Sequence, residues 1–263
     1  MDMKEFVKTI MLPTANGHRL QEYGLFHCIF FALTIAAMVF AVIYTLKNGE
    51  KNLYFLYILS SVLMWIGELY KQFCYSFQTG TFSYNWYFFP WQFCSTPLYT
   101  FLFCAIAKKG KLYDVVSAYN ATYALFAGTC VMLYPSTLVA NYGISFQSLL
   151  HHALMMITGV SALVLYAKKF SVKLFAQSFV VYCILLAIAI IINEAVGDSV
   201  NMYFISRTFK GDDNPFGVFQ KAYPYPLFVT VYVLLFTEFA ALIAHVAHVV
   251  AVKNENKRLK TSL

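Results

Sequence analysis

Seven apolar stretches, each long enough to cross a lipid bilayer, dominate this chain of 263 residues. A span needs about 20 apolar residues, and its backbone must be helical because lipid offers no hydrogen-bond partners. Only 12% of the residues are charged, against roughly 25% in a soluble domain. We therefore predict an all-α, polytopic membrane protein, a seven-transmembrane-helix bundle with spans near residues 24–46, 53–73, 90–107, 112–133, 146–167, 174–195 and 227–250.

This pattern divides the chain into three parts. Residues 1–23 are expected to form a short N-terminal surface segment, residues 24–250 the seven-helix transmembrane domain, and residues 251–263 a basic cytoplasmic tail. Many of the 20 tyrosines are expected in belts at the membrane surfaces. The net charge of +7 comes from lysines beside the spans, which favours a role in membrane orientation over nucleic-acid binding.

The basic residues predict that orientation. The loops at 76–89 and 134–145 contain no Lys or Arg, whereas twelve basic residues follow the first, third, fifth and seventh spans. By the positive-inside rule, the N-terminus lies outside and the C-terminus in the cytoplasm, and we expect a multi-pass protein of the cell membrane. The twelve are Lys47, Lys51, Lys108, Lys109, Lys111, Lys168, Lys169, Lys173, Lys253, Lys257, Arg258 and Lys260.

Polar side chains from several spans share one depth in this topology. Cys94 lies about four residues below the outer surface, or ~6 Å, and His152 about six residues, or ~9 Å. Glu68 and Asn193 fall in the outer parts of their own spans. Ionisable groups at membrane depth are costly and usually functional, so this layer is the predicted site.

Cys94 is the candidate nucleophile. We expect Pro90 to begin the third helix, which would place the thiol near a helix N-terminus, where a thiolate is stabilised. Gln92 and Ser95 are candidates to donate hydrogen bonds to an oxyanion. The alternative is that Cys94 is a small packing residue, as is expected for most of the six cysteines because they form no CxxC pair.

The histidine pair His151–His152 supplies the candidate base. Neighbours on a helix point about 100° apart, so only one of the two can face a given site. Histidine is the usual partner of a cysteine nucleophile, and Asn193 could orient the imidazole. The alternative is a helix–helix hydrogen bond.

Two further groups of charged residues have simpler explanations. Glu68 and Lys71 lie three residues apart and are expected to pair with each other. Glu238, His245 and His248 share one face of the seventh helix, which suggests either a metal or proton-relay site or internal hydrogen bonding. Because a single helix supplies the whole set, we expect no metal and no other cofactor.

Three short motifs resemble the transmembrane protein 164 acyltransferase family and its bacterial integral-membrane relatives. They are Pro90-Trp91-Gln92-Phe93-Cys94, Leu149-Leu150-His151-His152-Ala153-Leu154, and Asn193 followed by Asn201-Met202-Tyr203-Phe204. The separation of Cys94 and His152 is also similar. The resemblance implies a phospholipid acyltransferase that works without coenzyme A, with Cys94 as the acyl-accepting nucleophile and His152 as the base.

The predicted activity is therefore a transacylase acting on phospholipid and lysophospholipid through an acyl-thioester, with catalytic Cys94 and His152. His151, Gln92, Asn193, Asn201 and Glu68 are expected to support the site or bind substrate. A lipid hydrolase or thioesterase with the same pair remains an alternative, as does a small-solute transporter. A retinal protein is excluded because residues 222–252 contain no lysine for a Schiff base.

Overall fold

The computed structural model describes residues 3–12, 20–78, 80–137, 140–209 and 216–261, and all regular structure in them is helical. The α-helices are α1 (Met3–Ile10), α2 (Leu25–Asn48), α3 (Glu50–Ser76), α4 (Pro97–Ala107), α5 (Lys111–Tyr119), α6 (Leu125–Leu133), α7 (Tyr142–Tyr166), α8 (Val172–Val196), α9 (Gly217–Ala222) and α10 (Tyr225–Thr261). Shorter turns are η1 (Trp86–Phe88), η2 (Phe93–Ser95), η3 (Asn120–Ala124), η4 (Pro135–Thr137), η5 (Gly197–Ser199) and η6 (Met202–Phe204).

Six helical segments of the described chain are long and apolar enough to cross a membrane: α2, α3, α5 to α6, α7, α8 to η5, and α10. This confirms an all-α chain of the multi-pass membrane type. The predicted third span differs, because its α-helix begins at Pro97 and not at Pro90. Pro97 occupies the first helical turn, where a missing N–H costs nothing. Shortly before it, Phe93–Ser95 form the short turn η2. The 11 residues of α4 extend only ~16 Å, so this stretch alone is shorter than a full span.

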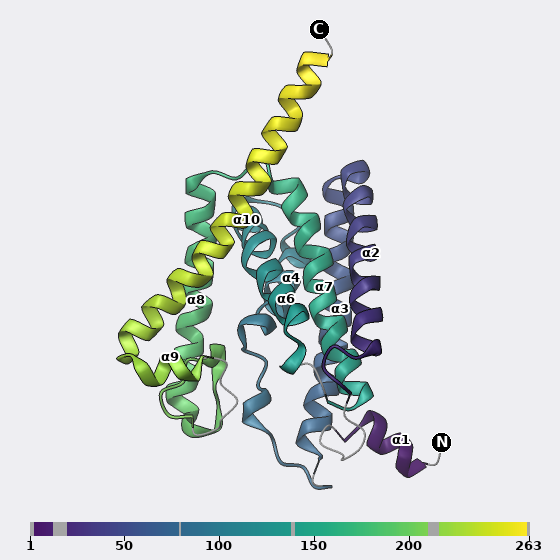
Figure 1. Cartoon of the computed structure of the whole chain (residues 1–263), viewed down its shortest axis with the longest axis vertical. Coiled ribbons are helices and arrows are strands. Elements are labelled where there is room, and N and C mark those ends of the chain that lie inside the picture. The colour runs from purple at the N-terminus through teal and green to yellow at the C-terminus, as the bar shows by residue number, and fades with distance from the viewer. Residues whose placement is uncertain (1–2, 13–19, 79, 138–139, 210–215, 262–263) are drawn as a thin grey trace.

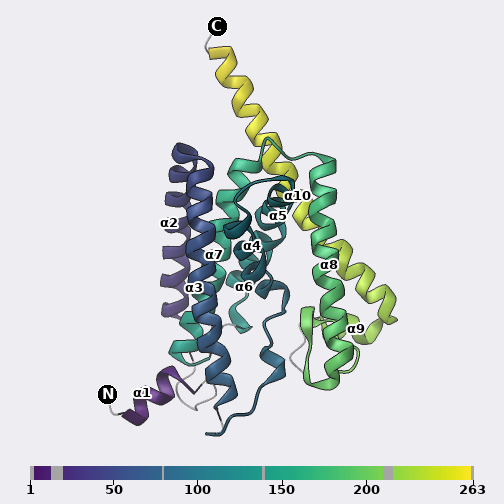
Figure 2. The same cartoon turned by 180° about the vertical axis from the view of Figure 1, so that it is seen from behind.

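The helices form two flanks around a central group (Figures 1 and 2). Helices α2 and α3 lie on one side, α8, α9 and α10 on the other, and α4 to α7 between them. Helix α7 packs against α2, α3 and α6, and α5 packs against α8. The N- and C-termini lie at opposite ends of the bundle; we call these the N-terminal end and the C-terminal end.

The lysine-bearing helix ends gather at the C-terminal end. Lys169 pairs with Glu50 at 3.0 Å, which joins the α7–α8 connection to the start of α3. Lys168 pairs with Glu255 of α10 at 2.8 Å. These contacts bring three of the predicted basic ends together. Helix α10 continues through the residues of the predicted tail as far as Thr261.

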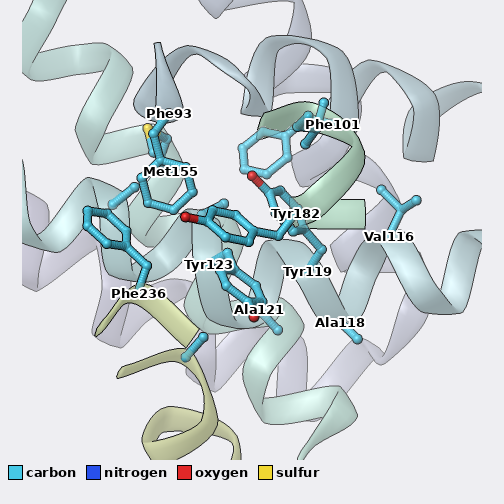
Figure 3. Close-up of a cluster of buried hydrophobic side chains, with 14 of the residues drawn as sticks. Phe93, Phe101, Val116, Ala118, Tyr119, Ala121, Tyr123, Met155, Tyr182 and Phe236 are labelled. Carbon is cyan, nitrogen blue, oxygen red and sulfur yellow. The ribbon is translucent and has the colours of Figure 1, made fainter. Parts of the chain in front are cut away.

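Many tyrosines lie in the core and not in surface belts. Figure 3 shows Tyr119, Tyr123 and Tyr182 packed among Phe93 and Phe236. The ring centroids of Tyr119 and Tyr123 lie 5.4 Å apart, and those of Tyr123 and Tyr182 lie 4.8 Å apart, in stacked geometry. Stacked rings gain energy beyond their buried area, which favours the core over the predicted belt for these residues.

The central α5–α6 span contains a π turn, η3, at Asn120–Ala124. The fully buried Asn120 side chain accepts a hydrogen bond of 2.6 Å from Thr100 of α4. Gly159 of α7 packs beside this turn, and a Cβ at that position would lie 2.9 Å from the Cβ of Leu125. Glycine therefore permits the close approach of α7 to the central span.

Candidate active site

Cys94 lies in the three-residue turn η2, immediately before α4. Its neighbours Phe93 and Ser95 are buried, while Cys94 itself is partly exposed. The predicted position in the first turns of a helix that begins at Pro90 is therefore wrong. The thiol precedes the helix, and its local geometry comes from the turn.

His151 is the histidine that contacts the residue Cys94. Its Nε2 lies 2.9 Å from the Cys94 carbonyl oxygen. Because a carbonyl only accepts hydrogen bonds, Nε2 carries the proton and donates it. This bond attaches the cysteine turn to α7, so the third and fifth predicted spans meet at this depth.

His152 has the opposite tautomer. Its Nδ1 lies 2.7 Å from the Ser148 carbonyl oxygen, so Nδ1 carries the proton and Nε2 keeps its lone pair. The side chain is 5% exposed, and Nε2 has no hydrogen-bond partner among the described residues. A buried nitrogen with a free lone pair costs folding free energy and is what a general base requires. In the described part of the chain, no hydrogen bond joins the Cys94 thiol to either imidazole.

A buried ion pair lies beside this group. Glu68, which is 2% exposed, accepts from Lys71 at 2.8 Å and from the Gln72 amide at 2.6 Å. The pairing of Glu68 with Lys71 confirms the prediction. Both charges lie within electrostatic reach of the Cys94 thiol, and Lys71 also lies within reach of both imidazoles. Glu68 therefore lies beside the site, and its carboxylate is already paired with Lys71.

Gln92 and Asn193 hold the backbone of the loop after α8. The Gln92 amide donates to the Asn201 carbonyl at 2.8 Å and accepts from the Tyr203 N–H at 2.9 Å. Asn193 donates to the Met202 carbonyl at 3.0 Å and accepts from the Met202 N–H at 2.7 Å. Both amides thus bind backbone and not an oxyanion or an imidazole, which differs from the roles predicted for them.

Asn201 contributes to the same loop. Its Oδ1 accepts a hydrogen bond of 2.9 Å from the Ser206 N–H. Its Nδ2 is buried without a partner among the described residues, so one polar atom of this predicted supporting residue is free to bind another group.

Tyr203 is a site residue that lies in one of the sequence motifs but for which the sequence predicted no role. Its φ is 57° and that of Phe204 is 58°, both in the left-handed region that bulky residues rarely adopt. Such strain persists only where the surroundings impose it, and here the amides of Gln92 and Asn193 do so. The Tyr203 ring lies 5.5 Å from that of Phe93, and its buried hydroxyl has no partner among the described residues.

A groove of 510 Å³ opens between α3 and α7 on the side of the histidine pair. Its walls are almost entirely apolar. Among its lining residues, His151 is the only histidine, and there is no Asp, Glu, Lys or Arg. Ile66 and Phe146 at its border are 60% and 49% exposed, so the groove opens on the outer, lipid-facing surface of the bundle. The lining residues are Ile10, Phe26, Leu63, Met64, Ile66, Gly67, Tyr70, Tyr142, Gly143, Phe146, Gln147, Leu150, His151 and Leu154.

The histidines of α10 lie apart from this site. His248 donates through Nδ1 to the Ala167 carbonyl at 3.0 Å, which is the internal hydrogen bonding expected of it. Glu238 and His245 are exposed. The described residues contain no group of three or more His, Cys, Asp or Glu side chains that could hold a metal ion.

The long apolar helices define a multi-pass helical membrane protein, and its cysteine turn and histidine pair meet within the bundle. Residues 22–252 match the TMEM164 family over most of the chain, and the protein belongs to that family. No curated protein and no solved structure matches the chain.

Proposed function

We propose that the protein is a membrane-embedded phospholipid acyltransferase, a coenzyme-A-independent transacylase with Cys94 as nucleophile and His152 as base. The observation that carries the proposal is the hydrogen bond from His151 to the Cys94 carbonyl. It joins the cysteine turn to the histidine pair, at the wall of an apolar groove. Membership of the TMEM164 family is consistent with this function.

The first half-reaction acylates the enzyme. His152 Nε2 accepts the proton of the Cys94 thiol, and the thiolate attacks the ester carbonyl of a phospholipid. The tetrahedral intermediate collapses by breaking the bond to the glycerol oxygen. That oxygen takes the proton from His152 and leaves as a lysophospholipid, while the acyl group stays on Cys94 as a thioester.

The second half-reaction reverses these roles. The hydroxyl of a different lysophospholipid gives its proton to His152 and attacks the thioester carbonyl. The Cys94 sulfur leaves and recovers the proton from His152. If water replaces the lysophospholipid, the same residues act as a lipid hydrolase. The product is then a free fatty acid, and no acyl group is transferred.

The groove supports a lipid substrate. Its apolar walls match an acyl chain, and its border faces the lipid surface, so a chain could enter sideways without leaving hydrocarbon. We place the site in the outer half of the cell membrane, with the N-terminus outside, because glycerol esters lie just below the head groups. Phospholipid and lysophospholipid are the proposed partners, with no nucleic acid and no metal.

The test is intact-protein mass spectrometry after reconstitution in phospholipid vesicles. We expect a fatty-acyl adduct that hydroxylamine releases, and its loss in Cys94→Ala. His152→Ala should slow adduct formation by about 100-fold or more, within the range for a removed general base. Cys183→Ala is the matched control, because Cys183 is a partly exposed membrane cysteine outside the site. An adduct that persists in Cys94→Ala would rule out the nucleophile.

A further inference from the structure

Helix α10 carries two ionisable side chains on a surface that the rest of the described chain leaves uncovered. Glu238 and His245 are exposed, although both lie within Tyr225–Lys257, the part of α10 that is long and apolar enough to cross a membrane. Neither makes a hydrogen bond or ion pair with any described residue. An ionisable group at this depth almost always faces a partner or water.

These two residues belong to one continuous stripe on α10, which we call the α10 seam. Its positions alternate at spacings of four and three residues, which is the heptad repeat by which two parallel helices pack. Val231, Leu235, Leu242 and Val252 are between 36% and 57% exposed. The full seam is Val231, Leu235, Glu238, Leu242, His245, Val249 and Val252.

We propose that the α10 seam is the interface with a second copy of this chain, in a dimer whose two-fold axis is normal to the membrane. Two copies inserted in the same direction must place their α10 helices parallel. Where two parallel helices pack along the two-fold axis itself, each residue next to the axis lies opposite its own copy. Glu238 then faces Glu238, and His245 faces His245.

The chemistry of the two groups suits this self-pairing. Two facing carboxyl groups can share a proton between their oxygens, and one imidazole can donate to the other, so each group can hydrogen-bond to its own copy. Lysine or arginine could not, because they only donate. The remaining seam positions are aliphatic, as a parallel helix pair requires, and the seam extends ~32 Å along the helix.

The first test maps the seam by disulfide cross-linking of the full-length protein in vesicles. Single cysteines replace Leu235 or Leu242, in a background with the exposed Cys28 and Cys130 changed to serine. We expect dimers from both. Thr230→Cys and Val250→Cys are the matched controls, because both residues are exposed but each lies about 100° around the helix from its neighbour in the seam. Equal cross-linking at the control positions would overturn the proposal.

The second test asks whether the polar groups hold the dimer. Fluorescently labelled copies are diluted with lipid, and energy transfer between them is measured. Glu238→Leu and His245→Leu should each lower the association constant by about 3- to 30-fold, the range of interhelical hydrogen bonds in membranes. Glu238→Gln should retain most of it, because an amide also donates and accepts. A wild-type protein that is monomeric at every lipid ratio, or unchanged association in both leucine variants, would refute the interface.

Discussion

At the scale of single residues, the site is built from partly satisfied polar groups. His151 donates to a backbone carbonyl, whereas His152 keeps a free Nε2. Two adjacent residues of one helix therefore have different functions, a structural donor and a candidate base. The cause is the roughly 100° between neighbours on a helix, which gives each imidazole its own surroundings.

The amide of Asn193 provides a prediction at this scale. Asn193→Ala would leave the N–H of buried Met202 unpaired, and its carbonyl would keep only the hydrogen bond of 3.3 Å from the Ile205 N–H. An unpaired buried backbone group costs about 1–3 kcal/mol, so we expect a loss in the free energy of unfolding of roughly 1–3 kcal/mol. The thermal unfolding midpoint in detergent measures it. The control is Asn48→Ala, which removes one exposed hydrogen bond to Tyr44 and should change little. Equal midpoints for the two variants would contradict the role of Asn193.

At the scale of elements, α3 and α7 create the groove. Gly67 of α3 and Gln147 of α7 meet at its wall, where a Cβ on Gly67 would lie 3.1 Å from the Gln147 side chain. Helices α3 and α7 approach closely here and separate beside this contact. The space between them is apolar and reaches His151. The groove is thus a consequence of how two helices cross.

Filling this groove tests its proposed role as the acyl-chain site. Leu63→Trp places a large ring among its lining residues, and we expect acyl transfer to fall by about tenfold or more while the protein stays folded. Val62→Trp is the control, because Val62 is 52% exposed on α3 and does not line the groove. Transfer of a labelled acyl chain between lipids in vesicles measures both. Equal activities of the two variants would argue against the groove as the binding site.

At the scale of the whole molecule, charge separates the two ends of the bundle. Lys168 and Lys169 are tied by ion pairs to α10 and α3, so basic helix ends from across the sequence gather at the C-terminal end. Figure 1 shows the N-terminus at the opposite end. This separation is the property on which the positive-inside rule acts.

The orientation follows as a prediction. We expect an epitope tag before Met1 to be accessible to an antibody on intact cells. A tag after Leu263 should become accessible only after permeabilisation. Changing Lys108, Lys109 and Lys111 to glutamine should increase the fraction inserted the other way, since basic residues favour the cytoplasmic side for the loop that carries them. Accessibility of the C-terminal tag on intact cells would reverse the proposed orientation.

The sequence predicted the helices well, because a stretch of apolar residues has one stable form in lipid. The spans predicted at 24–46 and 53–73 correspond to α2 and α3, and the pairing of Glu68 with Lys71 followed from their spacing. The start of α4 did not follow, because hydropathy alone does not distinguish a helix from an apolar turn such as η2. The roles of Gln92 and Asn193 were also missed, since their partners lie in a loop distant in sequence.

By itself, then, the sequence determined that this is a helical membrane protein, where its long helices lie, and which polar residues they carry. Only the tertiary structure decided which of these residues meet. The rotation of each helix about its own axis selects His151 for the Cys94 carbonyl and leaves Glu238 on the outside. In a bilayer the core and the lipid are both apolar, so the pattern of hydrophobic residues does not encode that rotation, and side-chain packing sets it.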